Sequence, residues 1–328
     1  MNNKTRDILM VLAIFTLSLL TGCASIFYVG GGTPDPPLPV TPANTETASV
    51  TPFLAMTNTP FIIPPTYTET ATFTPSATNT PLPTDTPIPT DTPVPTPTPG
   101  EEYNPGGYVV APILLYHHVA DVGYITRYYV TPDLFRSQLE KLREWGYTSI
   151  TASQLANVLI NGGNLPARPV VISFDDGNND IYDIAFPIMQ EMGFVGTFYI
   201  VGNRLHSNYF VHAEEIQEMV NAGWEIGDHG MSHIDLTLDY TTAHYEIQES
   251  RVDLEAAIGT QINTFAYPYG KTDEFITNKV SEYGYLAGMG LGRSWEHSLG
   301  SLFYLSRIEV QGDYDLSTFA ALLPWSGN

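Results

Sequence analysis

Strand and helix patterns alternate along residues 109–310, and this alternation restricts the possible fold more than any other feature of the chain. Short apolar runs such as Val170–Phe174 are each followed by a segment with apolar residues at helical spacing. Repeated strand-then-helix units build a parallel sheet, because the helix returns the chain to the starting edge of the sheet. The number of units predicts an α/β fold, a distorted (β/α) barrel of about seven strands.

Residue types at the ends of several segments support these predictions. Thr131 and Pro132 are typical of the N-cap and the first position of a helix, while Gly146 and Gly193 are typical of helix ends. The predicted strands are Val109–Tyr116, Val170–Phe174, Val195–Val201, Trp224–Ile226, Ile262–Tyr267, Tyr285–Met289 and Leu305–Val310. The predicted helices are 131–146, 155–159, 181–192, 213–222, 241–258 and 272–283.

The first hundred residues have a different composition. Residues 33–100 contain no Lys or Arg and are rich in Thr and Pro, with a six-residue repeat that starts at Pro83. Proline fixes φ and removes backbone donors, so neither helix nor sheet can propagate there. We therefore expect a disordered Thr/Pro-rich linker over residues 23–102, acting as a solvated spacer, and a globular domain over residues 103–328.

The N-terminus has the form of an export signal. Lys4 and Arg6 precede the apolar stretch Ile8–Leu20, which is short for a transmembrane helix. Leu20–Cys23 reads Leu-Thr-Gly-Cys and resembles the bacterial lipobox, which implies a lipoprotein signal peptide over residues 1–22 and a lipid anchor on Cys23. An uncleaved anchor helix is the alternative. Both place the rest of the chain outside the cytoplasmic membrane, and the lipoprotein hypothesis predicts an exported protein lipid-anchored at the cell surface.

Charge and cysteine content exclude some partners. The chain has 13 basic and 35 acidic residues, a formal net charge of −22. Such a charge disfavours nucleic acid and other polyanions as partners but tolerates neutral polymers. Cys23 is the single cysteine, so no disulfide can form within the chain. Nothing in the sequence predicts a protein partner.

Two pairs of polar residues follow predicted strands and point to a metal site. Asp175 and Asp176 end the run Pro169–Phe174, and His229 and His233 follow Trp224–Ile226. Each pair alone also fits a turn, a helix cap or an ordinary helix face. In a barrel, however, the carboxyl ends of the strands meet on one face. One carboxylate and two imidazoles then suit a divalent transition metal, and the second carboxylate suits a general base for hydrolysis.

Four segments resemble motifs of the polysaccharide deacetylases, carbohydrate esterase family 4. Ser173–Gly177 (Ser-Phe-Asp-Asp-Gly) resembles the first motif, which is usually Thr-Phe-Asp-Asp-Gly, and His229–His233 resembles the second. Phe265–Gly270 (Phe-Ala-Tyr-Pro-Tyr-Gly) resembles the third. Pro112–Val119 looks like the opening of the branch that includes poly-N-acetylglucosamine deacetylases. The resemblance covers roughly residues 110–310 and implies hydrolysis of N-acetyl groups on an acetylated glycan polymer.

The resemblance also implies roles for individual residues. Asp175 becomes the general base, His117 the general acid, and the backbone N–H of Tyr269 a donor to the oxyanion. The metal, most often zinc and otherwise cobalt or nickel, is held by three residues: Asp176, His229 and His233. A catalytically weak carbohydrate-binding lipoprotein and an O-deacetylase that uses the same site remain the alternative functions.

Three positions depart from the family pattern. Ala266 stands where the family has an arginine that orients the base, and no basic residue lies nearby. Gly230 replaces the usual Ser or Thr of the second motif, and Leu305–Val310 has no Leu-x-His. The last departure is consistent with His117 as the acid. His118 is interpreted as a packed or supporting histidine, because most histidines are structural.

Overall fold

The computed structural model describes residues 100–327. The predicted signal peptide, Cys23 and almost all of the Thr/Pro-rich linker lie outside the described residues and stay predictions. Within residues 100–327, no helix combines the length and the apolar character needed to span a bilayer.

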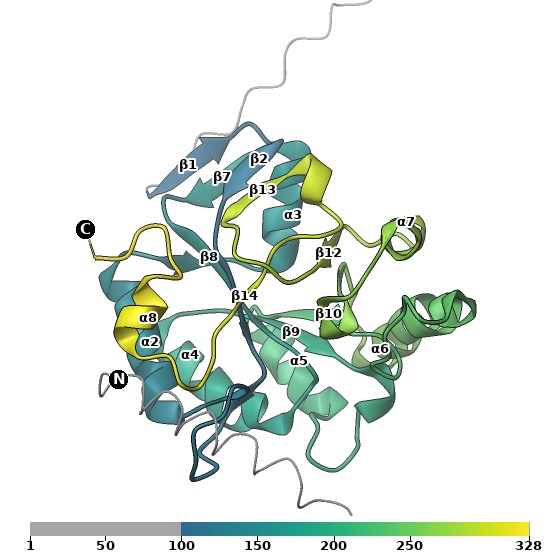
Figure 1. The fold of residues 1–328 in the computed structure, drawn as a ribbon, viewed down its shortest axis with the longest axis horizontal. Helices are drawn as coiled ribbons and strands as arrows, with labels where there is room; N and C mark the ends of the chain where they lie inside the picture. Colours follow the sequence, from purple (N-terminus) through teal and green to yellow (C-terminus); the bar gives the residue numbers. More distant parts are fainter. Residues whose placement is uncertain (1–99, 328) are drawn as a thin grey trace, which may run out of the picture. The chain divides into compact units, whose positions relative to one another are not determined.

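A curved sheet of parallel strands forms the centre of the domain (Figure 1). Its strand order is β12-β11-β10-β9-β8-β3-β14, with β6 pairing on the side of β8, and every one of these pairs is parallel. These strands are β3 (Ile113–Tyr116), β6 (Thr148–Ser149), β8 (Pro169–Phe174), β9 (Thr197–Ile200), β10 (Glu225–Asp228), β11 (Thr264–Ala266), β12 (Ala287–Met289) and β14 (Ile308–Glu309). The predicted α/β fold, a distorted barrel of parallel strands, is confirmed.

The two edges of this sheet come close without forming a full ladder. Within the described residues, the barrel edges meet through an isolated parallel bridge between Met289 of β12 and Leu305, just before β14. The barrel is therefore incompletely closed. This arrangement brings the edge strand β12 beside the segment that leads into β14, the other edge strand. Residues near 307 therefore lie close to the ends of the central strands.

Strand β8 shows how alternation builds two cores. All six of its residues are buried. Val170, Ile172 and Phe174 belong to the cluster that packs beneath the surrounding helices, whereas Val171 belongs to a second cluster with Tyr199 inside the barrel. Successive side chains of a strand point to opposite faces, and both faces here are covered. This explains why the strand reads as a continuous apolar run.

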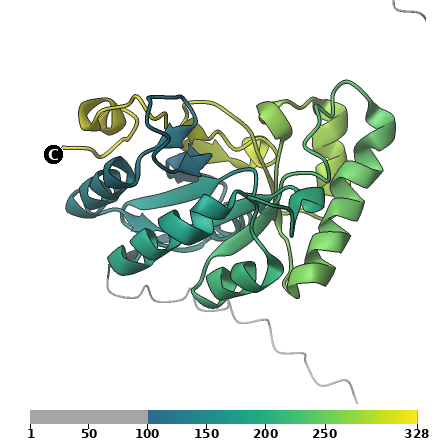
Figure 2. The ribbon, with the colours of Figure 1, turned by 90° about the horizontal axis from the view of Figure 1, so that it is seen from below.

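Helices cover the outer face of the sheet, as Figure 1 shows and Figure 2 confirms from below. Thr131 caps α2 by accepting a hydrogen bond from the Leu134 N–H, with Pro132 as the first helical residue. Gly193 ends α4 with a left-handed φ of 76°. Both predictions are confirmed. The helices are α2 (Pro132–Glu144), α3 (Ala152–Asn161), α4 (Phe186–Met192), α5 (Ala213–Asn221), α6 (Ser250–Ile258), α7 (Glu274–Glu282) and α8 (Leu316–Ala320).

Several boundaries differ from the prediction. The single strand expected over Val109–Tyr116 is two strands, β2 (Tyr108–Val110) and β3, because Pro112 has no N–H for a continuous ladder. The helices expected to start at 181 and 241 instead contain π-helical turns, Ile181–Ala185 and His244–Glu249. The remaining short strands are β1 (Glu101–Asn104), β4 (His118–Val119), β5 (Tyr129–Val130), β7 (Gly163–Pro166) and β13 (Glu296–Ser298).

Candidate active site

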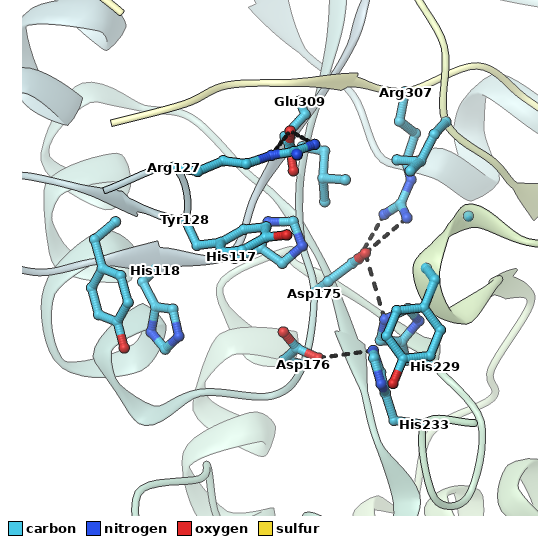
Figure 3. A pocket seen from close by; sticks show the side chains of 15 residues that line it. His117, His118, Arg127, Tyr128, Asp175, Asp176, His229, His233, Arg307 and Glu309 are labelled. Carbon is cyan, nitrogen blue, oxygen red and sulfur yellow. Dashed lines mark hydrogen bonds and ion pairs between the residues drawn. The ribbon is translucent and has the colours of Figure 1, made fainter. Parts of the chain in front are cut away.

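A cavity of about 450 Å³ opens where the carboxyl ends of the parallel strands meet. Its volume is in the usual range for small-molecule sites. The structure brings all six residues that the sequence singled out to the wall of this cavity, although they come from four separate segments. Figure 3 labels five of them, all except Tyr269. These residues are His117, Asp175, Asp176, His229, His233 and Tyr269.

Three of them form a group that fits one ion. The ligand atoms of Asp176, His229 and His233 all lie within 4.8 Å of one another. Nε2 of His233 is 3.3 Å from Oδ1 of Asp176. One carboxylate and two imidazoles are a donor set that zinc accepts while keeping positions open for other ligands.

The histidines are held in the form that a metal requires. Nδ1 of the buried His229 lies 2.7 Å from the carbonyl oxygen of Ala266, which can only accept, so Nδ1 carries the proton. The lone pair is therefore on Nε2, the nitrogen that faces the carboxylates. Burial, reinforced by the neighbouring His229, lowers the pKa of His233 to about 4, so its ring is neutral at pH 7. The donor set thus fits a divalent cation.

The backbone is bent sharply at three of these positions. Asp176, His233 and Tyr269 have φ values of 76°, 59° and 60°. This left-handed region is costly for residues with a Cβ, and in folded proteins it is often found at functional sites. Gly230 shares it, with φ of 79°, which gives a physical reason for glycine where the family has Ser or Thr.

Asp175 has a basic partner that the sequence analysis missed. Ala266 and its neighbours in the third motif offered no arginine to orient this carboxylate, but Arg307 reaches it from the segment before β14. Nη1 of Arg307 donates to Oδ1 of Asp175 at 2.6 Å, and Nη2 donates to Oδ2 at 2.8 Å (Figure 3). Arg307 is itself buried, donates through Nε to the carbonyl of Gly290 and lies over the ring of Tyr199.

The charge of Asp175 follows from this pair. Burial alone would raise its pKa, but the positive charge of Arg307, with a further contribution from His229, outweighs burial and lowers the pKa to about 2. Asp175 is consequently an anion at neutral pH even though it is 3% exposed. The sequence signal for this partner was a single arginine inside the predicted strand Leu305–Val310.

His117 and His118 have different environments. The half-buried His117 lines the cavity, with its ring against that of Tyr128 at a centroid distance of 4.9 Å. Burial lowers its pKa, and the negative charges of Asp175 and Asp176 oppose this effect. His118 lies apart from Asp175 and Asp176 in Figure 3; its Nδ1 is 3.1 Å from Oδ2 of Asp180, and its ring stacks on that of Tyr129 at a centroid distance of 4.0 Å. His118 is therefore a packed residue at the edge of the cavity.

Comparison with known proteins agrees with this geometry. Residues 162–288 match the family model described as Polysaccharide deacetylase. Bacillus subtilis YxkH, whose name describes a candidate polysaccharide deacetylase, is 24% identical over 213 residues, 65% of this chain and 75% of that protein. A poly-beta-1,6-N-acetyl-D-glucosamine N-deacetylase of Staphylococcus epidermidis is 24% identical over 204 residues, 58% of this chain and 70% of that protein.

Among solved structures, the deacetylase PplD of Streptococcus pyogenes in complex with acetate is similar to this chain. The TM-score is 0.61 at 22% identity, covering 66% of this chain and 98% of that one, which shows a shared fold. The family match and the relatives show that the central part of the described domain is similar to polysaccharide deacetylases. The matched range contains five of the six predicted site residues but neither His117 nor Arg307.

Proposed function

We propose that this protein is a metal-dependent hydrolase that removes N-acetyl groups from an N-acetylglucosamine-containing polysaccharide. One observation carries the proposal: an ionised, buried carboxylate, Asp175, lies beside a group of one carboxylate and two imidazoles in an open cavity. The family match and the Staphylococcus epidermidis relative support the reaction and the class of substrate.

Asp176, His229 and His233 would hold the ion, for which zinc is the first choice and cobalt or nickel the alternatives. When bound, such an ion supplies Lewis acidity toward an amide carbonyl and a neighbouring water. Asp175 accepts the proton of the attacking water. Both of its oxygens receive a hydrogen bond from Arg307, but each keeps a second lone pair for this purpose.

His117 supplies the second proton transfer. It shares the cavity with Asp175 and donates a proton to the departing nitrogen, so that the C–N bond breaks and the products are acetate and a free amine. The backbone N–H of Tyr269 is assigned to the oxyanion of the tetrahedral intermediate. The exposed ring of Tyr269, 4.6 Å from that of His233, forms part of the cavity rim on which a sugar ring can rest.

Acetate release from N-acetylglucosamine oligomers tests the proposal. We expect activity to disappear after chelation and to return with Zn²⁺, Co²⁺ or Ni²⁺. Asp175→Asn should lower turnover by about 10²- to 10⁴-fold, the usual contribution of a general base. Asp253→Asn, which changes an exposed carboxylate on α6, is the matched control and should leave turnover unchanged. Full activity after complete chelation would refute the proposal.

The same assay separates the two alternatives. An O-deacetylase would release acetate faster from O-acetylated than from N-acetylated sugars. A carbohydrate-binding protein would retain glycan without releasing acetate in the presence of added metal. The absence of the family arginine at Ala266 favours the binding protein, because the base would lack its orienting partner. Arg307 removes that argument because it contacts Asp175 directly.

We also infer, from the N-terminal sequence, that the enzyme is exported and lipid-anchored to the outer face of the cell membrane through Cys23. The stalk over residues 23–102 would then hold the catalytic domain away from the membrane. Labelling with a radioactive fatty acid tests this inference: the label should be lost in Cys23→Ser, whereas Ser25→Ala should keep it.

A further inference from the structure

A second group of metal-binding side chains lies outside the cavity, between β9 and the first turn of α5. His206, His212 and Glu214 each offer one ligand atom, and these atoms lie within 4.8 Å of one another. The two imidazole rings contact each other at a centroid distance of 5.2 Å and an interplanar angle of 89°. We propose that these three residues bind a second divalent transition-metal ion of the zinc class, with solvent completing its coordination.

The donor set and its spacing suit such an ion. Two imidazoles with one carboxylate is a combination that zinc accepts. Ligand atoms on one tetrahedral zinc ion are about 3.3 Å apart. The ligand atoms of these three side chains therefore have to approach one another by at most roughly 1.5 Å. All three are exposed and are free to rotate into place. The neighbouring Glu215 has another role: its Oε2 accepts a hydrogen bond from the His212 N–H at 2.7 Å, and it is not one of the three residues whose ligand atoms come together.

The backbone holds the two histidines together before any ion binds. Residues 206–212 form a turn that is closed by the His206 N–H donating to the carbonyl of Val211 at 3.4 Å. The Val211 N–H donates to the carbonyl of Gly177 at 2.9 Å, and the Asn179 N–H donates to that of Tyr209 at 3.0 Å. The turn is therefore tied to the segment that follows Asp176.

This connection gives the second ion a role. Arg204, at the start of the same segment, donates to Oδ1 of Asp176 at 3.2 Å and lies over the ring of Phe210, 5.1 Å from its centroid. An ion bound to His206 and His212 would fix the turn that carries Phe210. It would thereby stiffen the support of Asp176. The role assigned to the second ion is structural and rests on the proposed function only for this last step.

The rival interpretation is an ordinary solvated surface, in which Glu214 only complements the helix dipole of α5. A comparison within this chain separates the two. His244 and Glu249 are also exposed and lie 3.6 Å apart, but they offer only two ligands. If both places are ordinary solvated surface, His206 and His244 should bind a metal ion to the same extent. If the first is a three-ligand site, the ion should bind at His206 and not at His244.

The experiment uses the full chain without a histidine tag and with Co²⁺ as the probe. His229→Ala/His233→Ala first removes the candidate ion in the cavity, so the readout does not depend on activity. In this background we expect about one bound Co²⁺ per chain, with the intense visible absorption of a tetrahedral ion. Adding His206→Ala/His212→Ala should abolish it. Adding His244→Ala instead should leave it unchanged. Circular dichroism confirms that each variant is folded.

Two results would overturn the proposal: no Co²⁺ bound in the background variant, or undiminished binding after His206→Ala/His212→Ala. Neither bears on the deacetylase itself. Failure of the proposed function would appear separately, as wild-type protein that binds metal in the cavity yet releases no acetate.

Discussion

The guanidinium of Arg307 holds both carboxylate oxygens of Asp175, at 2.6 and 2.8 Å, across a separation of 132 residues in the chain. Both side chains are buried. The bidentate geometry fixes the orientation of the carboxylate as well as its charge, which lysine cannot do. The carboxylate that we propose as the general base is thereby oriented by the residue that immediately precedes β14.

Arg307 should accordingly act as a positioning residue. Arg307→Lys keeps a positive charge but loses the pair of parallel hydrogen bonds to the carboxylate. We expect kcat to fall by about 10²-fold with a small change in KM, because a misplaced base slows only the chemical step. In Arg307→Met we expect kcat to fall further. We also expect the free energy of unfolding to fall by about 3–5 kcal/mol, since the variant leaves Asp175 as an unpaired buried charge. Steady-state kinetics and urea unfolding measure both effects.

The stability control is an ion pair at the cavity rim in which only the arginine is exposed, since Glu309 is 13% exposed. Arg127 lies 2.6 Å from Glu309 but is 57% exposed, so Arg127→Met should cost less than about 1 kcal/mol. Equal losses of stability in Arg127→Met and Arg307→Met would contradict the role given to the buried pair.

The same pair predicts how stability depends on pH. The pKa of Asp175 is lowered from 3.8 to about 2, so the unfolded chain binds this proton first as the pH falls. Ionised Asp175 therefore contributes on the order of 2 kcal/mol to the free energy of unfolding. This contribution is complete above pH 4 and is lost as the pH falls from about 4 to 2. Urea unfolding at a series of pH values should show this slope in the wild type. Persistence of the full slope in Asp175→Asn would assign it to other carboxyl groups.

His117 can be tested through the leaving group. His117→Gln should lower acetate release from N-acetylated oligomers by about 10²-fold or more, because an amine departs poorly without a proton. An activated acetyl ester such as p-nitrophenyl acetate needs no such proton and should be cleaved at nearly the wild-type rate. His118→Gln, beside it in the sequence, should change neither rate strongly. Equal losses on both substrates would remove His117 from the role of acid.

The interior of the barrel leaves no space at Gly227 in β10. A Cβ built on this residue would stand 2.2 Å from the ring of Tyr199. Gly227→Ala should therefore lower the free energy of unfolding by about 1–3 kcal/mol through overpacking. Gly300→Ala, whose Cβ would meet only the Ser298 hydroxyl at 3.6 Å, should be nearly neutral in the same denaturation experiment.

Much of this fold could be predicted from the sequence because its determinants are local. The apolar runs, Thr131 as a cap and Gly193 as a helix end each act within a few residues. The polar pairs after the strands also located the cavity, since parallel strands bring their carboxyl ends together. The π-helical turns were missed because apolar spacing does not distinguish them from an α-helix.

Arg307 was missed for a different reason. Its partner is 132 residues away, and only the pairing of β14 with β3, next to β8, brings the two together. The group of His206, His212 and Glu214 was missed in the same way. No periodic pattern joins these residues, and their juxtaposition depends on a turn whose path is set by hydrogen bonds to residues 177–179.

The left-handed backbone at Asp176, His233 and Tyr269 has a consequence for how such an enzyme changes over generations. Glycine relieves roughly 1 kcal/mol of strain at each position, so in the metal-free chain losing these side chains makes the fold sturdier. Under the proposed function, drift that rewards stability alone leads away from hydrolysis and toward an inert descendant with an intact barrel. These three side chains then persist only where the lineage depends on the reaction itself.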